Sequence, residues 1–289
     1  MRVTVATRRS ALALAQSRAV AVALEDAGHE ASLLEMTTTG DRWSLAGSQA
    51  QPGMDVKGMF VKELEEALLD GRADIAVHSA KDLPGDLPPG LAVIATPARE
   101  HPGDVLVGSP GGLDALPAGA RIGTTSPRRR AQVLAARPDL QVVEVRGNVD
   151  TRLAKLDAGD VDALVLAAAG LRRLGIARDD AVTLPLDLCL PAAGQGIVAI
   201  EGRDGDDAVR QACAALDDPA SRACLAAERA FLARLGGGCS VPAGALCQMD
   251  GDTLRMRAWW DGSGLFADVN GPVGDPAGLG ARAAEQVGA

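Results

Sequence analysis

The stretch MFVKELEEALLDGRADIAVH, at residues 59–78, indicates the fold. Residues 59–69 have the apolar spacing of an amphipathic helix, and Gly71 is typical of a helix C-terminus. Residues 74–78 are a short apolar run typical of a buried strand. A helix followed at once by a buried strand is the repeating element of βαβ folds, so we expect mostly parallel sheets.

The same alternation extends in both directions from this stretch. Upstream, Ser10 suits the N-cap of a helix that runs to about residue 27, between predicted strands at 2–6 and 31–36. Downstream, a second unit has strands that end at residue 123 and cover 141–145 and 161–167, with helices at 127–136 and 149–156. A strand at 197–201 is predicted to return to one of the sheets. Helices at 206–216 and 221–235 follow, then a strand-bearing segment and a last helix at 276–287.

The composition excludes several classes of protein. A length of 289 residues suits two or three domains, and no apolar run reaches the roughly 20 residues of a membrane span. The net charge of −9 and an aromatic content of 2% argue against nucleic-acid binding. The five cysteines lack zinc-binding spacing, so we predict no metal site and reduced thiols in a cytoplasmic protein without a signal peptide.

The run GTTSPRRR, at residues 123–130, points to an anion. Ser126 suits an N-cap and Pro127 the first helical position, so three arginines would crowd a helix N-terminus. The helix dipole is already positive at that end, and a bound anion would make this placement favourable. The alternative is that the arginines point to solvent.

Other cations follow predicted strand ends, where ligands of open α/β sheets bind. Residues 121–178 contain eleven Lys or Arg and six Asp or Glu. The pattern indicates a ligand with several carboxylates or phosphates, and the absence of GxxxxGK[ST] and GxGxxG disfavours a nucleotide. The alternative is a solvated surface. The cations at predicted strand ends are Arg8, Arg9, Arg146, Arg152, Arg172 and Arg173.

Two further residues are candidates for chemistry. Asp82, in HSAKDLP, follows a buried strand and could stabilise positive charge on a substrate, or could simply bond its own loop backbone. Cys239 follows three glycines, so its thiol is either accessible or merely part of a turn. Gln195 could be a turn residue or a ligand contact. Cys189, Cys213 and Cys224 lie among Leu and Ala and are predicted to be core.

These motifs resemble the hydroxymethylbilane synthase (porphobilinogen deaminase) family over nearly the whole chain. The matching runs, in the family's order, are ATRRSALALAQ, TTTGD, VKGMFVKELEEALLDGRADIAVHSAKDLP, GTTSPRRR, EVRGNVDTRLAKLD, LAAAGLRRLG, LPAAGQGIVAIE and GGGCSVPAG. The resemblance implies two α/β domains of the type II periplasmic-binding kind around a cleft, with a small C-terminal α/β domain. The expected domains are residues 1–97 with 196–215, residues 98–195, and residues 216–289.

The resemblance also implies a reaction, in which four porphobilinogen molecules are deaminated and joined head to tail. Cys239 would carry a dipyrromethane cofactor through a thioether. Asp82 would assist the loss of ammonia and stabilise the azafulvenium and the protonated pyrrole nitrogens. Residues implied to contact cofactor or substrate are Arg8, Ser10, Lys57, Lys81, Thr125, Ser126, Arg128, Arg129, Arg146, Arg152, Arg173 and Gln195, with a weaker match for Ser79, Thr124, Gly147 and Gly170.

The sequence departs from the family pattern at a few positions. Thr39 stands where many members carry Arg, Pro127 replaces a frequent Leu, and the final domain is short and Gly-rich. Two alternative functions remain at this point. One is a non-catalytic, two-domain binding protein for a small polycarboxylate, and the other is a transferase that uses Cys239 as its turnover nucleophile. The resemblance further implies a monomer that acts on a small molecule, without nucleic acid or membrane.

Overall fold

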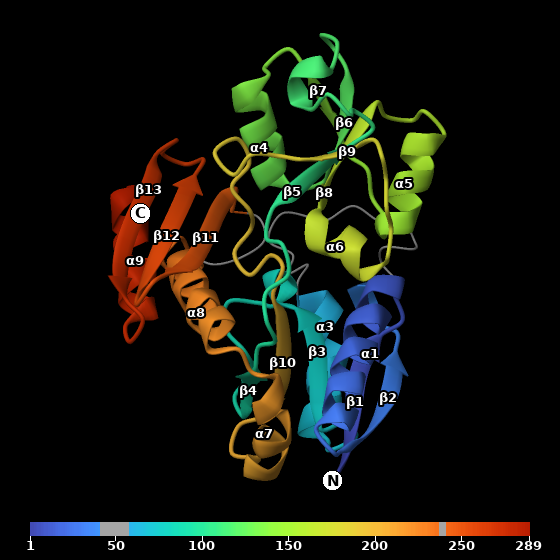
Figure 1. Ribbon diagram of the computed structural model, residues 1–289, viewed down its shortest axis with the longest axis vertical. Helices are drawn as coiled ribbons and strands as arrows, with labels where there is room; N and C mark the ends of the chain where they lie inside the picture. Colours follow the sequence, from blue (N-terminus) through green and yellow to red (C-terminus); the bar gives the residue numbers. More distant parts are fainter. Residues whose placement is uncertain (41–57, 237–240) are drawn as a thin grey trace.

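The computed structural model describes residues 1–40, 58–236 and 241–289, and its first five-stranded sheet has the order β2-β1-β3-β10-β4 (Figure 1). β1 pairs in parallel with β2 and β3, whereas β10 is antiparallel to β3 and β4. The predicted strand at 197–201 therefore does return, and it does so to the first sheet. The elements are β1 (Arg2–Arg8), α1 (Ala11–Asp26), β2 (Glu30–Met36), α3 (Gly58–Leu69), β3 (Ile75–Ser79), β4 (Leu91–Ala95), β10 (Val198–Arg203) and α7 (Asp207–Cys213).

The second sheet has the same plan, in the order β7-β6-β8-β5-β9. β6 is parallel to β7 and β8, and β5 is antiparallel to β8 and β9. Its elements are β5 (Asp104–Val107), β6 (Arg121–Gly123), α4 (Pro127–Ala136), β7 (Gln141–Val143), α5 (Val149–Asp157), β8 (Ala163–Ala167), α6 (Ala168–Arg173) and β9 (Ala181–Thr183). Both sheets are thus mixed, with parallel strands inside the βαβ units that the sequence predicted.

The C-terminal part forms a smaller unit with one three-stranded antiparallel sheet, β11-β12-β13. Along β12, Leu254, Met256 and Ala258 are buried, while Thr253 before them and Arg255 between them are exposed, as the period of two in a strand requires. The elements are α8 (Pro219–Arg234), β11 (Ala243–Asp250), β12 (Thr253–Trp260), β13 (Phe266–Pro272) and α9 (Pro276–Gln286). The predicted α/β class, with two larger domains and a small third one, is confirmed.

Local sequence signals fix several helix starts. The Ser10 side chain accepts a hydrogen bond from the backbone N–H of Ala13 at the start of α1. At α4, Ser126 caps the helix and Pro127 occupies its first turn, as predicted. Some predicted boundaries are wrong. The helix expected over 206–216 ends at Cys213 and continues as a 3₁₀ turn over Ala214–Leu216, and the strands expected over 141–145 and 161–167 are shorter, at Gln141–Val143 and Ala163–Ala167.

The chain crosses twice between the two larger domains, once from β4 to β5 and once from β9 to β10 (Figure 1). The small domain packs against both. Leu225 of α8 joins a buried cluster with Ala80 and Leu83 of the first domain, and Trp259 of β12 packs with Leu190 from the second crossing. All three domains therefore meet around the crossings.

Candidate active site

Asp82 lies at the exposed end of a short turn that follows β3. The turn is a 3₁₀ helix over Ala80–Asp82, in which Ala80 is buried and Asp82 is exposed. Leu83, which follows, is buried at 2% exposure and its N–H donates to the Ala80 carbonyl. The two apolar side chains anchor the turn, so the Asp82 carboxylate is left on the surface.

The second crossing, which joins β9 to β10, packs directly against this turn. The Ala80 N–H donates to the Ile197 carbonyl at 2.9 Å. Gly194 adopts a φ of +73°, and a Cβ at this position would lie 3.0 Å from the backbone nitrogen of Lys81. A positive φ and such a close approach both favour glycine, so the crossing can pack directly on the turn.

Helix α8 holds the other end of the same loop. The Arg229 guanidinium donates to the carbonyls of Pro84 and Gly85, at 2.9 and 2.5 Å. Burial lowers the pKa of Arg229, and the Asp86 carboxylate opposes that effect. The loop that carries Asp82 is therefore fixed by contacts from both the crossing and the third domain.

Two cations, one from each larger domain, lie close enough to Asp82 to respond to its charge. Burial lowers the pKa of Lys81 to about 8, and the charge of Asp82 acts in the opposite direction. Burial lowers the pKa of Arg152 to about 10, where Arg129 lowers it further and Asp82 raises it. Lys81 comes from the first domain and the two arginines from the second, so the structure brings these predicted site residues together between the domains.

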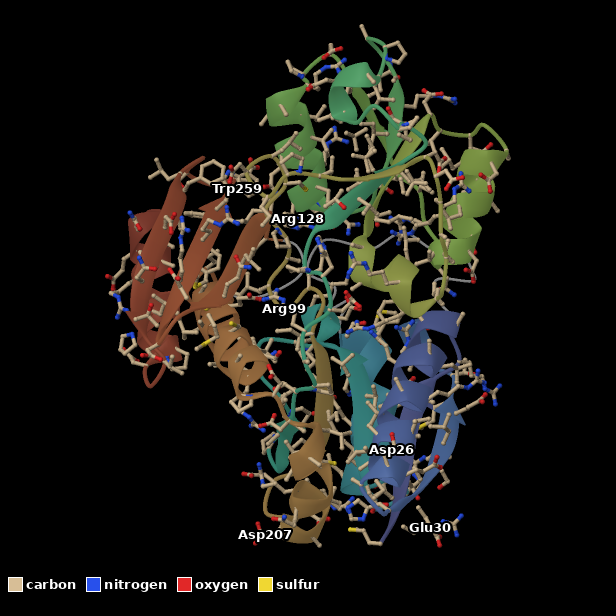
Figure 2. All side chains as sticks on the ribbon, in the orientation of Figure 1. Asp26, Glu30, Arg99, Arg128, Asp207 and Trp259 are labelled. Atoms are coloured by element: carbon tan, nitrogen blue, oxygen red, sulfur yellow. The ribbon has the colours of Figure 1, made fainter. Side chains whose placement is uncertain are left out.

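The arginines of α4 have a partner that the sequence did not reveal. Arg128 and Arg129 are 4% and 6% exposed, and both donate to the fully buried carboxylate of Asp104. Figure 2 shows Arg128 close to the junction of the domains. The alternative in which the arginines point to solvent is wrong for this pair. It holds for Arg130, which is exposed and donates to the carbonyl of Val142.

Gln195 is buried in the second crossing at 1% exposure. Its Nε2 donates to the carbonyl of Pro102 at 2.7 Å and to Asp104 Oδ1 at 2.9 Å. Gln195 Oε1 and Arg128 Nε are buried and have no hydrogen-bond partner among the residues that the structure describes. Because Oε1 is an acceptor and Nε is a donor, this cluster can still form a hydrogen bond of each kind with a ligand.

The remaining predicted residues of the first domain lie at the ends of β1 and β3 and at the start of α1. The Arg8 guanidinium lies 4.4 Å from the centre of the Phe60 ring. Ser79 exchanges hydrogen bonds with Gln16 of α1, at 2.9 and 3.2 Å. Ser10, as the cap of α1, has its hydroxyl engaged at the same helix.

In the second domain, the predicted residues follow β6, β7 and β8. The Thr124 hydroxyl is buried and accepts from the Ser126 N–H, while Thr125 is exposed. Arg146 pairs with Glu144, and Arg152 donates to the Gly147 carbonyl. The last two predicted residues are Gly170, which is buried in α6, and Arg173, whose guanidinium donates to the Gly196 carbonyl at 2.7 Å.

Other cations of the basic segment are neutralised by acids close to them, which fits the alternative of a solvated surface. Their side-chain N···O distances are between 2.7 and 2.9 Å. They therefore do not contribute to an anion site. The pairs are Arg121 with Asp162, Arg137 with Asp139, Arg172 with Glu100, and Arg178 with both Asp157 and Asp180.

Two of the candidate residues, Lys57 and Cys239, lie outside the described residues. The other four cysteines are free and buried, so the core positions predicted for Cys189, Cys213 and Cys224 are confirmed. Within the described ranges there is no group of three side chains suited to a metal ion. In those ranges no helix has the length and apolar character that a membrane span requires.

Sequence reasoning missed several buried charges. Glu228 of α8 is fully buried and pairs with Arg99, and His78 Nε2 lies 3.0 Å from Glu201 Oε2 between β3 and β10. Asp104 is the third such acid. The partner of each acid lies far away in the chain, so no local pattern in the sequence could reveal the pair.

Two protein-family models match most of the chain. A family model described as "Porphobilinogen deaminase, dipyromethane cofactor binding domain" matches residues 3–211, and one described as "Porphobilinogen deaminase, C-terminal domain" matches residues 222–287. The porphobilinogen deaminase of Roseiflexus castenholzii is 48% identical over 98% of this chain and 95% of that protein. The porphobilinogen deaminase of Sorangium cellulosum is 51% identical over 88% of this chain and 85% of that protein.

Solved structures with a similar trace include the methionine-binding protein MetQ, at 13% identity and a TM-score of 0.47, which covers 74% of this chain and 89% of that one. A nutrient-binding protein from Burkholderia cenocepacia, bound to methionine, has 14% identity and a TM-score of 0.45, and covers 75% of this chain and 92% of that one.

Proposed function

Because this chain belongs to the porphobilinogen deaminase family, we propose that Asp82 is its catalytic carboxylate and that Cys239 anchors its cofactor. The chain is a transferase of porphyrin and haem biosynthesis, a hydroxymethylbilane synthase. It removes ammonia from four porphobilinogen molecules, joins the pyrroles head to tail and releases the linear tetrapyrrole. The reaction needs a site that binds several carboxylates and stabilises positive charge on the substrate.

The described residues fit a dipyrromethane cofactor, the group that the matched family model names. When bound through a thioether to Cys239, this group supplies the pyrrole carbon to which the first substrate is joined. Each pyrrole of the substrate carries an acetate and a propionate, so cofactor and product chain present many anions. Lys81, Arg129 and Arg152 are cations at the domain junction, and the unpartnered Arg128 Nε is a buried donor among the described residues.

Asp82 supplies the opposite charge in the same place. The main support for this role is that the carboxylate is exposed at the end of its turn. It is also close enough to Lys81 and Arg152 for its charge to act on both. Loss of ammonia leaves positive charge on the substrate. A carboxylate already held at that point stabilises the charge without reorganisation, which is why its position matters more than its basicity.

The other predicted residues complete the proposed site. We infer that they hold the carboxylates and ring nitrogens of cofactor and substrate, with the arginines and lysines as the main anchors. Support comes from the described members of the set, which lie on the loops and helices that follow β1, β3, β6, β7 and β8 and, for Gln195, on the second crossing. The residues are Arg8, Ser10, Lys57, Ser79, Lys81, Thr124, Thr125, Ser126, Arg128, Arg129, Arg146, Gly147, Arg152, Gly170, Arg173 and Gln195.

We also propose the domain boundaries 1–97 with 196–215, 98–195, and 216–289, which keep each of the three sheets in one domain. The enzyme works as a cytoplasmic monomer without nucleic acid or membrane, and the net charge of −9 and the free, buried cysteines support this. Light scattering of the purified protein tests the monomer directly, because a dimer would have twice the mass.

Asp82→Asn tests the role of the carboxylate, with Asp86→Asn as the matched control from the same loop. We expect kcat to fall by roughly 10² to 10³ in Asp82→Asn, because one preorganised electrostatic contact is lost. Asp86 is also exposed and should tolerate the change with less than a twofold effect. Thermal unfolding confirms that both variants fold. If Asp82→Asn keeps more than a third of the wild-type kcat, the role proposed for Asp82 is wrong.

A further inference from the structure

The strongest cluster of buried polar groups outside the Asp82 loop is centred on Asp104, the first residue of β5. Its side chain is 0% exposed and accepts from four side chains. Arg128 Nη2 donates at 2.8 Å, and Arg129 donates through Nη2 at 2.7 Å and Nε at 3.2 Å. Gln195 Nε2 donates at 2.9 Å and the Cys189 thiol at 3.3 Å. One carboxylate thus joins α4 to the second crossing.

The cluster keeps a net positive charge. Burial alone favours a neutral acid, but the charges of Arg128 and Arg129 outweigh it and hold the pKa of Asp104 well below its usual range. Burial and the Asp104 charge raise the pKa of Cys189 to about 12, so the thiol is a neutral donor. Two guanidinium groups against one carboxylate leave one positive charge close to Lys81, whose pKa responds to all three ions.

The hydrogen bonds fix both guanidinium planes. A guanidinium has about five N–H groups in a rigid fork. Arg129 also donates from Nη1 to the Val165 carbonyl at 3.0 Å, so its three nitrogens all have partners. Arg128 donates from Nη1 to the Leu190 carbonyl at 2.6 Å. With planes fixed in this way, the directions of the N–H groups that remain are set before any ligand arrives.

Stability alone gives no reason for such an arrangement. Buried ion pairs and triads are often no more stabilising than apolar residues of similar volume, because desolvation of the charges offsets their attraction. The second observation is that Arg128 Nε and Gln195 Oε1 are buried without partners among the described residues. A cluster that keeps polar atoms unpaired is suited to a ligand that pairs them.

We propose that Asp104 is a positioning residue, which orients Arg128 and Arg129 so that their remaining N–H groups bind the carboxylates of the pyrrole chain, and orients Gln195 so that its free Oε1 accepts from a pyrrole N–H. It acts through these side chains and does not itself touch substrate. The inference rests on the proposed function, since it takes the pyrrole carboxylates as the ligands. It assigns a role to a residue that no sequence motif of the site contains.

Asp104→Asn keeps the size of the side chain and removes its charge. The matched control is Asp162→Asn, which removes the charge from an exposed Asp that accepts a fork from Arg121 in the same domain. The measurements are the intact mass of each protein, to count the cofactor, and kcat and KM for porphobilinogen per molecule of folded holoenzyme. Normalising in this way separates a loss of orientation from a loss of stability.

We expect Asp104→Asn to lower kcat/KM about 10²-fold, mostly through KM, because displaced guanidinium groups bind carboxylates poorly. Asp162→Asn should stay within about twofold of wild type. Wild-type KM and kcat in folded, cofactor-loaded Asp104→Asn would overturn the proposal. A wild-type enzyme without turnover and without added mass would instead contradict the proposed function.

Asp104→Glu covers the case in which Asp104→Asn does not fold. It keeps the charge and adds one methylene, a change of volume that a packed site can accommodate while the protein still folds. A charge-balancing role predicts wild-type KM and kcat for Asp104→Glu. A positioning role predicts a KM at least about tenfold higher, because the carboxylate no longer sits where both guanidinium groups require it.

Discussion

Glu228→Gln perturbs the contact that joins the third domain to the crossings. The Glu228 carboxylate is fully buried and accepts four hydrogen bonds. Its Oε1 accepts from Arg99 Nη1 at 2.6 Å and from the Cys247 N–H at 2.7 Å. Its Oε2 accepts from Arg99 Nη2 at 3.3 Å and from the Gly194 N–H at 2.6 Å. Figure 2 shows Arg99 at the centre of the molecule, between the domains.

The magnitude follows from these partners. In either orientation, the glutamine NH₂ group faces one Arg99 N–H and one backbone N–H, so two donors lose their acceptor. An unsatisfied buried donor costs about 1–3 kcal/mol, and a buried cation left without its partner makes the total about 3–5 kcal/mol. For a protein of this size, such a loss lowers Tm by roughly 10 °C.

Urea unfolding followed by tryptophan fluorescence measures this loss, since Trp259 and Trp260 report on the third domain. The control is Glu66→Gln, whose carboxylate lies 3.9 Å from Lys62 on the surface and should contribute less than about 0.5 kcal/mol. A loss below about 1 kcal/mol in Glu228→Gln would refute the reasoning, because it would mean that the four hydrogen bonds carry little net energy.

Two further predictions concern the Asp82 loop. Because burial lowers the pKa of Lys81 to about 8, the side chain loses its positive charge as pH rises through 8. We therefore expect kcat/KM to fall over that range, and the fall to be absent in Lys81→Gln but present in the exposed control Lys62→Gln. Gly194→Ala should lower both Tm and kcat by displacing Ala80. The control Gly205→Ala has a similar φ of +90° but open space, and should lower Tm only; equal kcat values in both variants would contradict the contact.

Much of the fold could be predicted because its signals are local. Ser126 and Pro127 start α4 where the sequence placed it, and the alternation of β12 follows from the pleat of a strand. The end of α7 at Cys213 could not be predicted in this way. The predicted helix and the 3₁₀ turn that continues it share nearly the same apolar spacing, so tertiary packing decides where one becomes the other.

The candidate site was predictable only in part. The position of Asp82 after a buried strand is a local feature, and the structure places it as expected. Asp104 gave no such signal, because its partners lie 24, 25, 85 and 91 residues away along the chain. The arginine cluster of α4 did predict an anion. In the structure, a protein carboxylate occupies that role, and contact with a ligand stays a prediction.

The attachment of the cofactor to Cys239 is the central claim, and one experiment tests it most directly. The intact mass of the wild-type protein, measured by electrospray beside Cys239→Ala, should exceed the sequence mass by two condensed pyrroles, and the variant should lack this addition. If wild type remains unmodified even after incubation with porphobilinogen, or if Cys239→Ala carries the same added mass, the account of Cys239 as the attachment point is contradicted.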